Sequence, residues 1–168
     1  MSGGTRSYEM ALQLIERGHE VHIITSNRRM FSDGKNWKEE VVEGITIHWI
    51  GLPYDNKMSF IQRIKVFLKF SFLAGKKAVN IGGDIVFATS TPLTIAIPAI
   101  RAKNELNIPM VFEVRDLWPE LPISIGLLRN PILKYMAKKL ELRAYRYPDA
   151  IIGLSPGMCI GVENTGYP

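Results

Sequence analysis

The chain has 168 residues, of which 46% are hydrophobic and 22% are charged. These values exclude a disordered or fibrous chain and leave room for one globular domain of ordinary size. The formal net charge of +5 is compatible with three kinds of partner: nucleic acid, an anionic membrane surface or a phosphate-bearing substrate. A single cysteine, Cys159, excludes an internal disulfide and favours a reducing cytoplasm.

The first third of the chain is predicted to contain a helix, a strand and a hairpin. Apolar residues recur at helical spacing over residues 5–17, and a short apolar strand follows at 21–25. Val41-Val42 and residues 45–50 flank Glu43 and Gly44, so a small hairpin is expected there.

Strands and helices alternate through the rest of the sequence. The longest predicted helix covers residues 57–80. Further strands are predicted at 84–88, 110–114 and 150–154, and further helices at 92–106 and 131–147. This alternation predicts an α/β fold of the Rossmann-like type, with a mostly parallel sheet and helices on both faces.

Ligands of open α/β sheets bind beyond the carboxyl ends of the strands. Four segments fall there, at residues 3–4, 89–92, 115–116 and 155–157. Gly3 and Gly4 would let backbone N–H groups approach a phosphate at a helix N-terminus, although a plain loop is the alternative. The hydroxyls of Ser90 and Thr91 (within the second segment) could cap a helix or contact a ligand.

The stretch Glu113–Glu120 is the most informative one chemically. Arg115 could pair with a phosphate, and Asp116 could orient or deprotonate a hydroxyl. The alternative is structural: a salt bridge for Arg115, a helix cap for Asp116 and a core position for Trp118. Chemistry alone leaves both interpretations open.

The helix predicted at 57–80 is basic on one side. Lys65, Lys69 and Lys76 lie within one narrow arc, which suits contact with anionic lipid head groups, while an ordinary surface helix is the alternative. Many aromatic residues of this helix point instead toward the expected core. A nucleic-acid partner is therefore not predicted.

Several other chemistries lack their motifs. His19, His22 and His48 share no ligand spacing and Cys159 has no partner motif, so no metal site is predicted. The sequence has no nucleophile elbow and no phosphate loop. A dinucleotide-binding oxidoreductase is disfavoured because the complete Gly-x-Gly-x-x-Gly fingerprint is not evident.

Four stretches, at residues 3–9, 14–21, 115–120 and 154–158, together resemble glycosyltransferase family 4. They read Gly-Gly-Thr-Arg-Ser-Tyr-Glu, Leu-x-x-x-Gly-His-Glu-Val, Arg-Asp-Leu-Trp-Pro-Glu and Leu-Ser-Pro-Gly-Met. The sequence is similar above all to bacterial members that build surface polysaccharides, including transferases of the fucosamine type. The resemblance covers nearly the whole chain in order, and Asp-Leu-Trp-Pro-Glu is its most specific part.

The resemblance implies the amino-terminal, acceptor-side half of a GT-B enzyme, which retains anomeric configuration and needs neither metal nor other cofactor. Residues 155–157 would lie near the interdomain hinge. The implied partners are a nucleotide-sugar donor and a lipid-linked or saccharide acceptor. We assign catalysis to Arg115 and Asp116, donor binding to Gly3 and Gly4, acceptor binding to Ser90, Thr91 and Glu120, and membrane contact to Lys65, Lys69 and Lys76.

Relative to that family, a first strand before Gly3 and a carboxy-terminal donor domain are expected to be absent, so the isolated chain is expected to be inactive. The missing strand would expose edges, and strands 21–25 and 84–88 are expected to pair directly or through a second molecule. No signal peptide or membrane span is predicted, which places the chain in the cytoplasm or peripherally on the inner membrane face. The rival interpretation is a non-catalytic fragment that binds a membrane or a partner.

Overall fold

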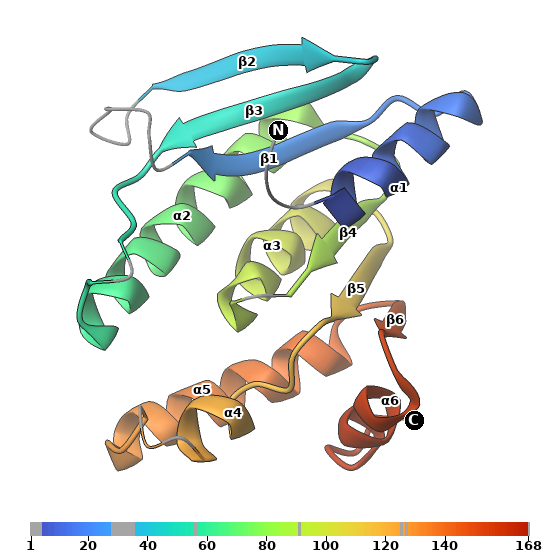
Figure 1. The fold of residues 1–168 in the computed structure, drawn as a ribbon. Helices are drawn as coiled ribbons and strands as arrows, with labels where there is room; N and C mark the ends of the chain where they lie inside the picture. The colour runs from blue at the N-terminus through green and yellow to red at the C-terminus, as the bar shows by residue number, and fades with distance from the viewer. Residues whose placement is uncertain are drawn as a thin grey trace. The chain divides into compact units, whose positions relative to one another are not determined.

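The computed structural model separates the chain into two compact units, residues 1–58 and 59–168 (Figure 1). Strands and helices alternate in the second unit, and the first combines one helix with three strands, which confirms the predicted α/β class. Three of the four strand pairings are parallel. The structure describes residues 5–27, 36–55, 57–90, 92–124, 126 and 128–167.

The first unit contains one helix and a three-stranded sheet. Its elements are α1 (Thr5–Glu16), β1 (His22–Asn27), β2 (Trp37–Val42) and β3 (Ile45–Gly51). The strand order is β1-β3-β2, with β1 parallel and β2 antiparallel to β3. The predicted turn is confirmed: Glu43 and Gly44 both have positive φ, 50° and 83°, as a two-residue hairpin connection requires.

The core of this unit lies between α1 and one face of the sheet. Ala11 of α1 packs with Ile45 and Ile47 of β3, and all three are buried. The apolar face predicted for the helix therefore does cover a sheet. Gly18, at φ 84°, follows the helix in the conformation that glycine adopts without steric cost.

Two histidines that are distant in sequence meet on this sheet. His22 Nδ1 lies 3.0 Å from His48 Nε2, with the rings nearly parallel. Each ring is also hydrogen-bonded to a carboxylate, His22 to Glu20 and His48 to Glu39. Among the described residues no group of three or more His, Cys, Asp and Glu side chains has the arrangement of a metal site.

The second unit carries the remaining elements. In chain order they are α2 (Phe60–Ile81), β4 (Val86–Thr89), the 3₁₀ helix η1 (Leu93–Ile95), α3 (Ala96–Leu106), β5 (Met110–Val114), α4 (Glu120–Ser124), α5 (Pro131–Arg146), β6 (Ala150–Gly153) and α6 (Pro156–Glu163). The sheet is fully parallel, in the order β4-β5-β6.

The core of the second unit joins the sheet to α3 and α5, which connect successive strands (Figure 1). Met110, Phe112 and Val114 alternate along β5 and are completely buried. They pack with Ala99 of α3 and Tyr145 of α5. Since these two helices share one core, they cover the same face of the sheet.

Local sequence signals explain the helix boundaries of this unit. Ser59 caps α2 through a capping box with Gln62, and the Asn130 side chain caps α5 one residue before Pro131. The helix predicted from residue 92 starts later, because Pro92 leads into the 3₁₀ turn η1 before α3 begins.

The described strands form one three-stranded sheet in each unit. Within the two units β1 pairs with β3 and β4 pairs with β5, and direct pairing of strands 21–25 and 84–88 stays a prediction. Bridging by a second molecule stays a prediction.

Candidate functional site

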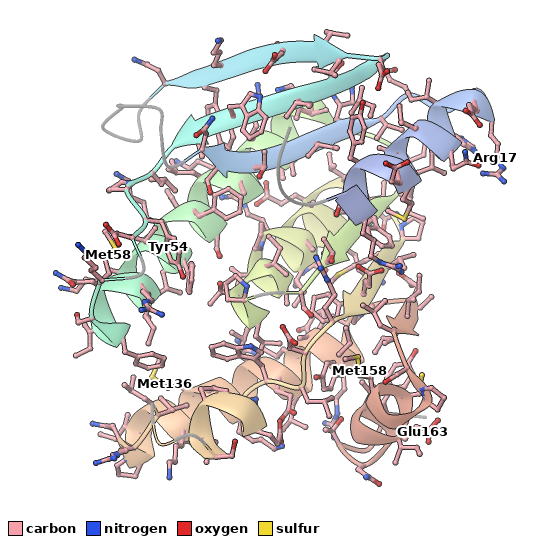
Figure 2. All side chains as sticks on the ribbon, in the orientation of Figure 1. Arg17, Tyr54, Met58, Met136, Met158 and Glu163 are labelled. Atoms are coloured by element: carbon pink, nitrogen blue, oxygen red, sulfur yellow. The ribbon has the colours of Figure 1, made fainter. Side chains whose placement is uncertain are left out.

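A pocket lies at the carboxyl edge of the β4-β5-β6 sheet. It has a volume of about 420 Å³ and is lined by Asp116, Leu117, Glu120, Ser124, Ser155, Gly157 and Met158. These residues come from the segment after β5, from α4 and from the start of α6. Figure 2 shows Met158 on the side of α6 that faces the chain after β5. The pocket therefore occupies the place where open α/β sheets bind ligands.

The pocket lining combines two carboxylates, two hydroxyls and two apolar side chains. Ser155 is the N-cap of α6, and its Oγ accepts a hydrogen bond from Met158 N at 3.3 Å. Carboxylates accept hydrogen bonds, hydroxyls donate and accept them, and Leu117 and Met158 offer apolar contact. Such a lining suits a neutral polyhydroxylated ligand better than a polyanion, because two carboxylates would repel phosphate groups.

The structure places the predicted catalytic pair in two different environments. Asp116 lines the pocket, whereas Arg115 is exposed and is not among the lining residues. The predicted acceptor residue Glu120 lines the pocket with Asp116, as do Ser155 and Gly157. Trp118 packs against the core, in agreement with the structural alternative for that residue.

Ser90 has a structural position. It is 2% exposed, and its Oγ accepts a hydrogen bond from Arg115 N at 2.9 Å. It caps no described helix, since the N-cap of η1 is Pro92. Nearby, Thr89 donates a hydrogen bond to the buried carboxylate of Glu113 at 2.7 Å. These contacts tie the end of β4 to the end of β5, and Ser90 is not among the residues that line the pocket.

Three of the predicted site residues lie outside the described part of the chain: Gly3, Gly4 and Thr91. The lysines Lys65, Lys69 and Lys76 are on the exposed face of α2. No helix of the described residues combines the length and apolar character needed to cross a membrane.

Sequence reasoning missed the pocket residue Ser124 because it did not predict the short helix α4. The two prolines within 119–122 argue against a helix in the sequence, although Glu120 and Ser124 are spaced by one helical turn. It also missed Lys138, whose ammonium is 2.9 Å from Glu120 Oε1. Because a lysine on an exposed helix face is ordinarily solvated, nothing in the sequence singled it out.

The wall of the pocket formed by Leu117 rests on a glycine of α6. A Cβ added to Gly161 would lie 2.6 Å from Leu117 Cδ1 and 2.8 Å from Cδ2, closer than atoms can approach. In contrast, a Cβ added to Gly157 would have its nearest neighbour, Ser155 Oγ, at 3.9 Å. The two glycines of one helix therefore form a matched pair for substitution.

We expect Gly161→Ala to destabilise the second unit by about 1–3 kcal/mol through overpacking and to push Leu117 into the pocket. Gly157→Ala should be neutral or stabilising, because alanine is favoured over glycine in a helix by about 1 kcal/mol. Urea unfolding of both variants measures the difference. Equal stability of the two variants would contradict the close approach of α6 to Leu117.

A parallel sheet with a pocket at its carboxyl edge is the arrangement of a Rossmann-like domain. The sequence profile described as Glycosyltransferase Family 4 matches residues 3–168. The chain therefore belongs to this family, and its role is of the glycosyltransferase type. No curated protein matches the sequence at a significant level.

Proposed function

We propose that the chain is the acceptor-side domain of a retaining, metal-independent glycosyltransferase of surface polysaccharide synthesis. It would act with a donor-binding domain to move a sugar from a nucleotide-sugar donor to a lipid-linked or saccharide acceptor. The fucosamine-type specificity suggested by the sequence belongs to this proposal. The observation that carries it is the pocket lined by Asp116, Glu120, Ser124 and Ser155 at the carboxyl edge of the sheet.

The chemistry of the pocket supports an acceptor rather than a donor diphosphate. Asp116 and Glu120 can accept hydrogen bonds from sugar hydroxyls, and Asp116 could take the proton of the reacting hydroxyl. Leu117 and Met158 can pack against the C–H groups of a sugar ring. The volume of about 420 Å³ is within the range of small-ligand pockets.

The proposal is tested by amide NMR with the methyl glycosides of glucose, galactose and N-acetylglucosamine, and with uridine diphosphate as the donor probe. At least one glycoside should shift the amides of Leu117 and Met158. Asp116→Asn should weaken this binding about tenfold, since a hydrogen bond to a charged group is lost. Asp84→Asn, an exposed change at the opposite edge of the sheet, should leave binding unchanged.

Two results would contradict the acceptor assignment. One is a shift of the pocket amides by uridine diphosphate and by none of the glycosides. The other is glycoside binding that Asp116→Asn leaves intact, because the ligand would then lie elsewhere. Circular dichroism of each variant confirms that the fold is retained.

We also infer that the exposed face of α2 contacts an anionic membrane. The three lysines Lys65, Lys69 and Lys76 share this face with three large apolar side chains, Ile61, Leu68 and Phe72, which are 60%, 47% and 57% exposed. Phe60, Ile64, Phe67 and Ala74, which the sequence places opposite the lysines, are partly or fully buried, and Ile61, Leu68 and Phe72 lie beside the lysines on the exposed face. Apolar insertion combined with basic residues is the pattern of helices that lie in a membrane interface.

Sedimentation with vesicles of phosphatidylglycerol and phosphatidylcholine tests this contact. The triple change Lys65→Gln, Lys69→Gln and Lys76→Gln should strongly reduce binding to the anionic vesicles, since each lysine near such a surface contributes about 1 kcal/mol. The matched control neutralises three exposed cations of α5: Lys139, Arg143 and Arg146. A loss of vesicle binding in the α5 variant alone would mean that α5, and not α2, contacts the membrane.

A further inference from the structure

An ionic cluster links the pocket wall to a buried carboxylate. Lys138 Nζ of α5 lies 2.9 Å from Glu120 Oε1 and 2.6 Å from Glu141 Oε2. The Glu141 side chain is 1% exposed, whereas those of Lys138 and Glu120 are 49% and 54% exposed. One ammonium group therefore connects a carboxylate inside the protein with a carboxylate that lines the pocket.

The buried end of the cluster gives the bridge a fixed anchor. A salt bridge between two exposed side chains is usually loose, because both groups are well solvated and keep several rotamers. Glu141 is in a different position: its buried Oε2 has no hydrogen-bond partner among the described residues, and its counter-ion is Lys138 at 2.6 Å. A buried carboxylate strongly favours a nearby counter-ion, which restrains Lys138.

The pKa values of Glu141 and Lys138 are both shifted by their contact and by burial. Burial raises the pKa of Glu141, Lys138 opposes that rise, and the carboxylate of Glu120 adds to it. Burial lowers the pKa of Lys138, but its hydrogen bonds to Glu141 and Glu120 outweigh this effect, so its pKa is raised overall. The ammonium group therefore stays charged at neutral pH.

We propose that Lys138, anchored by Glu141, is a positioning residue that holds the Glu120 carboxylate at the pocket wall for hydrogen bonding to an acceptor hydroxyl. Lys138 contacts Oε1, so the acceptor would be bound through Oε2 of Glu120. The inference rests on the proposed function of the pocket. It assigns a role to Lys138 and Glu141 of α5, which do not line the pocket. In this role the buried Glu141 fixes Lys138, and Lys138 in turn fixes Glu120.

The anchoring is tested without a ligand by ¹⁵N NMR of the lysine side chains at low temperature. The Lys138 ammonium should be protected from exchange with water, and Glu141→Gln should remove that protection. Glu120→Gln should leave most of it, because the buried partner remains. Protection that survives Glu141→Gln would overturn the anchoring.

The positioning is tested with the same methyl glycosides. Lys138→Met should weaken binding about tenfold, as expected when a charge-assisted contact is lost, and Lys138→Arg should restore most of the affinity. Lys139→Met, an exposed change on the same helix, should have no effect. When Glu120→Gln is already present, adding Lys138→Met should weaken glycoside binding little further, because both changes remove the same Lys138–Glu120 interaction.

Two outcomes would overturn the positioning role: unchanged binding in Lys138→Met, or losses that add fully in the double variant. Melting temperatures measured alongside exclude unfolding as the cause. If no glycoside binds the wild-type pocket, the proposed function fails, and the positioning role fails with it. If Asp116→Asn weakens binding but Lys138→Met does not, the proposed function stands and only this inference fails.

Discussion

Replacing Phe112 with alanine is expected to lower the free energy of unfolding of the second unit by about 3–5 kcal/mol, the usual cost of such a truncation in a core. Phe112 is completely buried in the middle of β5. Its ring is tilted at 56° to that of Tyr145, with centroids 6.4 Å apart. Alanine would leave a cavity between the sheet and α5 that these side chains cannot refill without shifting the sheet.

Urea unfolding, followed by hydrogen exchange of the β5 amides, measures this loss in the second unit itself. The matched control is Phe72→Ala on α2, where the side chain is mostly exposed and the cost should stay within about 0.5 kcal/mol. Similar losses at the two positions would mean that β5 is not the centre of the core. The control also shows whether the α2 surface can be changed freely in the vesicle experiment.

The second large effect is a pH-dependent loss of stability in Lys138→Met. Removing the ammonium leaves Glu141 buried without its counter-ion, so its folded-state pKa rises further above the unfolded value of 4.5. Between these two pKa values the folded state holds more protons than the unfolded state, so stability falls as pH rises. The variant should therefore lose little stability relative to the wild type at pH 4 and most at pH 7.

At pH 7 we expect a cost of about 1–3 kcal/mol, toward the low end because Lys138 is half exposed and solvent screens the pair. Urea unfolding of wild type and variant at pH 4 and pH 7 measures it. Adding Glu141→Gln to Lys138→Met should recover stability at pH 7, since no buried charge then remains. A cost that is the same at both pH values would rule out Glu141 as its source.

Much of the secondary structure could be predicted because its signals are local. Residues 110–114 are apolar except for Glu113, and β5 has the bounds predicted from them. Asn130 and Pro131 mark the start of α5 through a side-chain cap and a fixed φ angle. The hairpin at Glu43 and Gly44 also has a local signal, because its turn requires positive φ, which glycine adopts readily.

The features that could not be predicted depend on contacts between distant residues. The strand order within each sheet, such as β1-β3-β2, is a matter of pairing between strands, which short-range patterns do not encode. Glu141 looks like an ordinary helix residue in the sequence, and only the packing of α5 shows that it is buried. His22 and His48 share no ligand spacing, yet the register of β1 with β3 brings their rings together.

Ser155 gives the pocket a directional preference. Because its oxygen already accepts the N–H of Met158, its own hydrogen is the group most available to a ligand. The carboxylates of Asp116 and Glu120, by contrast, can only accept while they are ionised. A bound molecule would therefore present hydrogens to Asp116 and Glu120 and a lone pair to Ser155, as a sugar can with its hydroxyl hydrogens and its hydroxyl or ring oxygens. A purely donating ligand such as an alkylammonium ion would satisfy the carboxylates and leave Ser155 without a partner for its hydrogen.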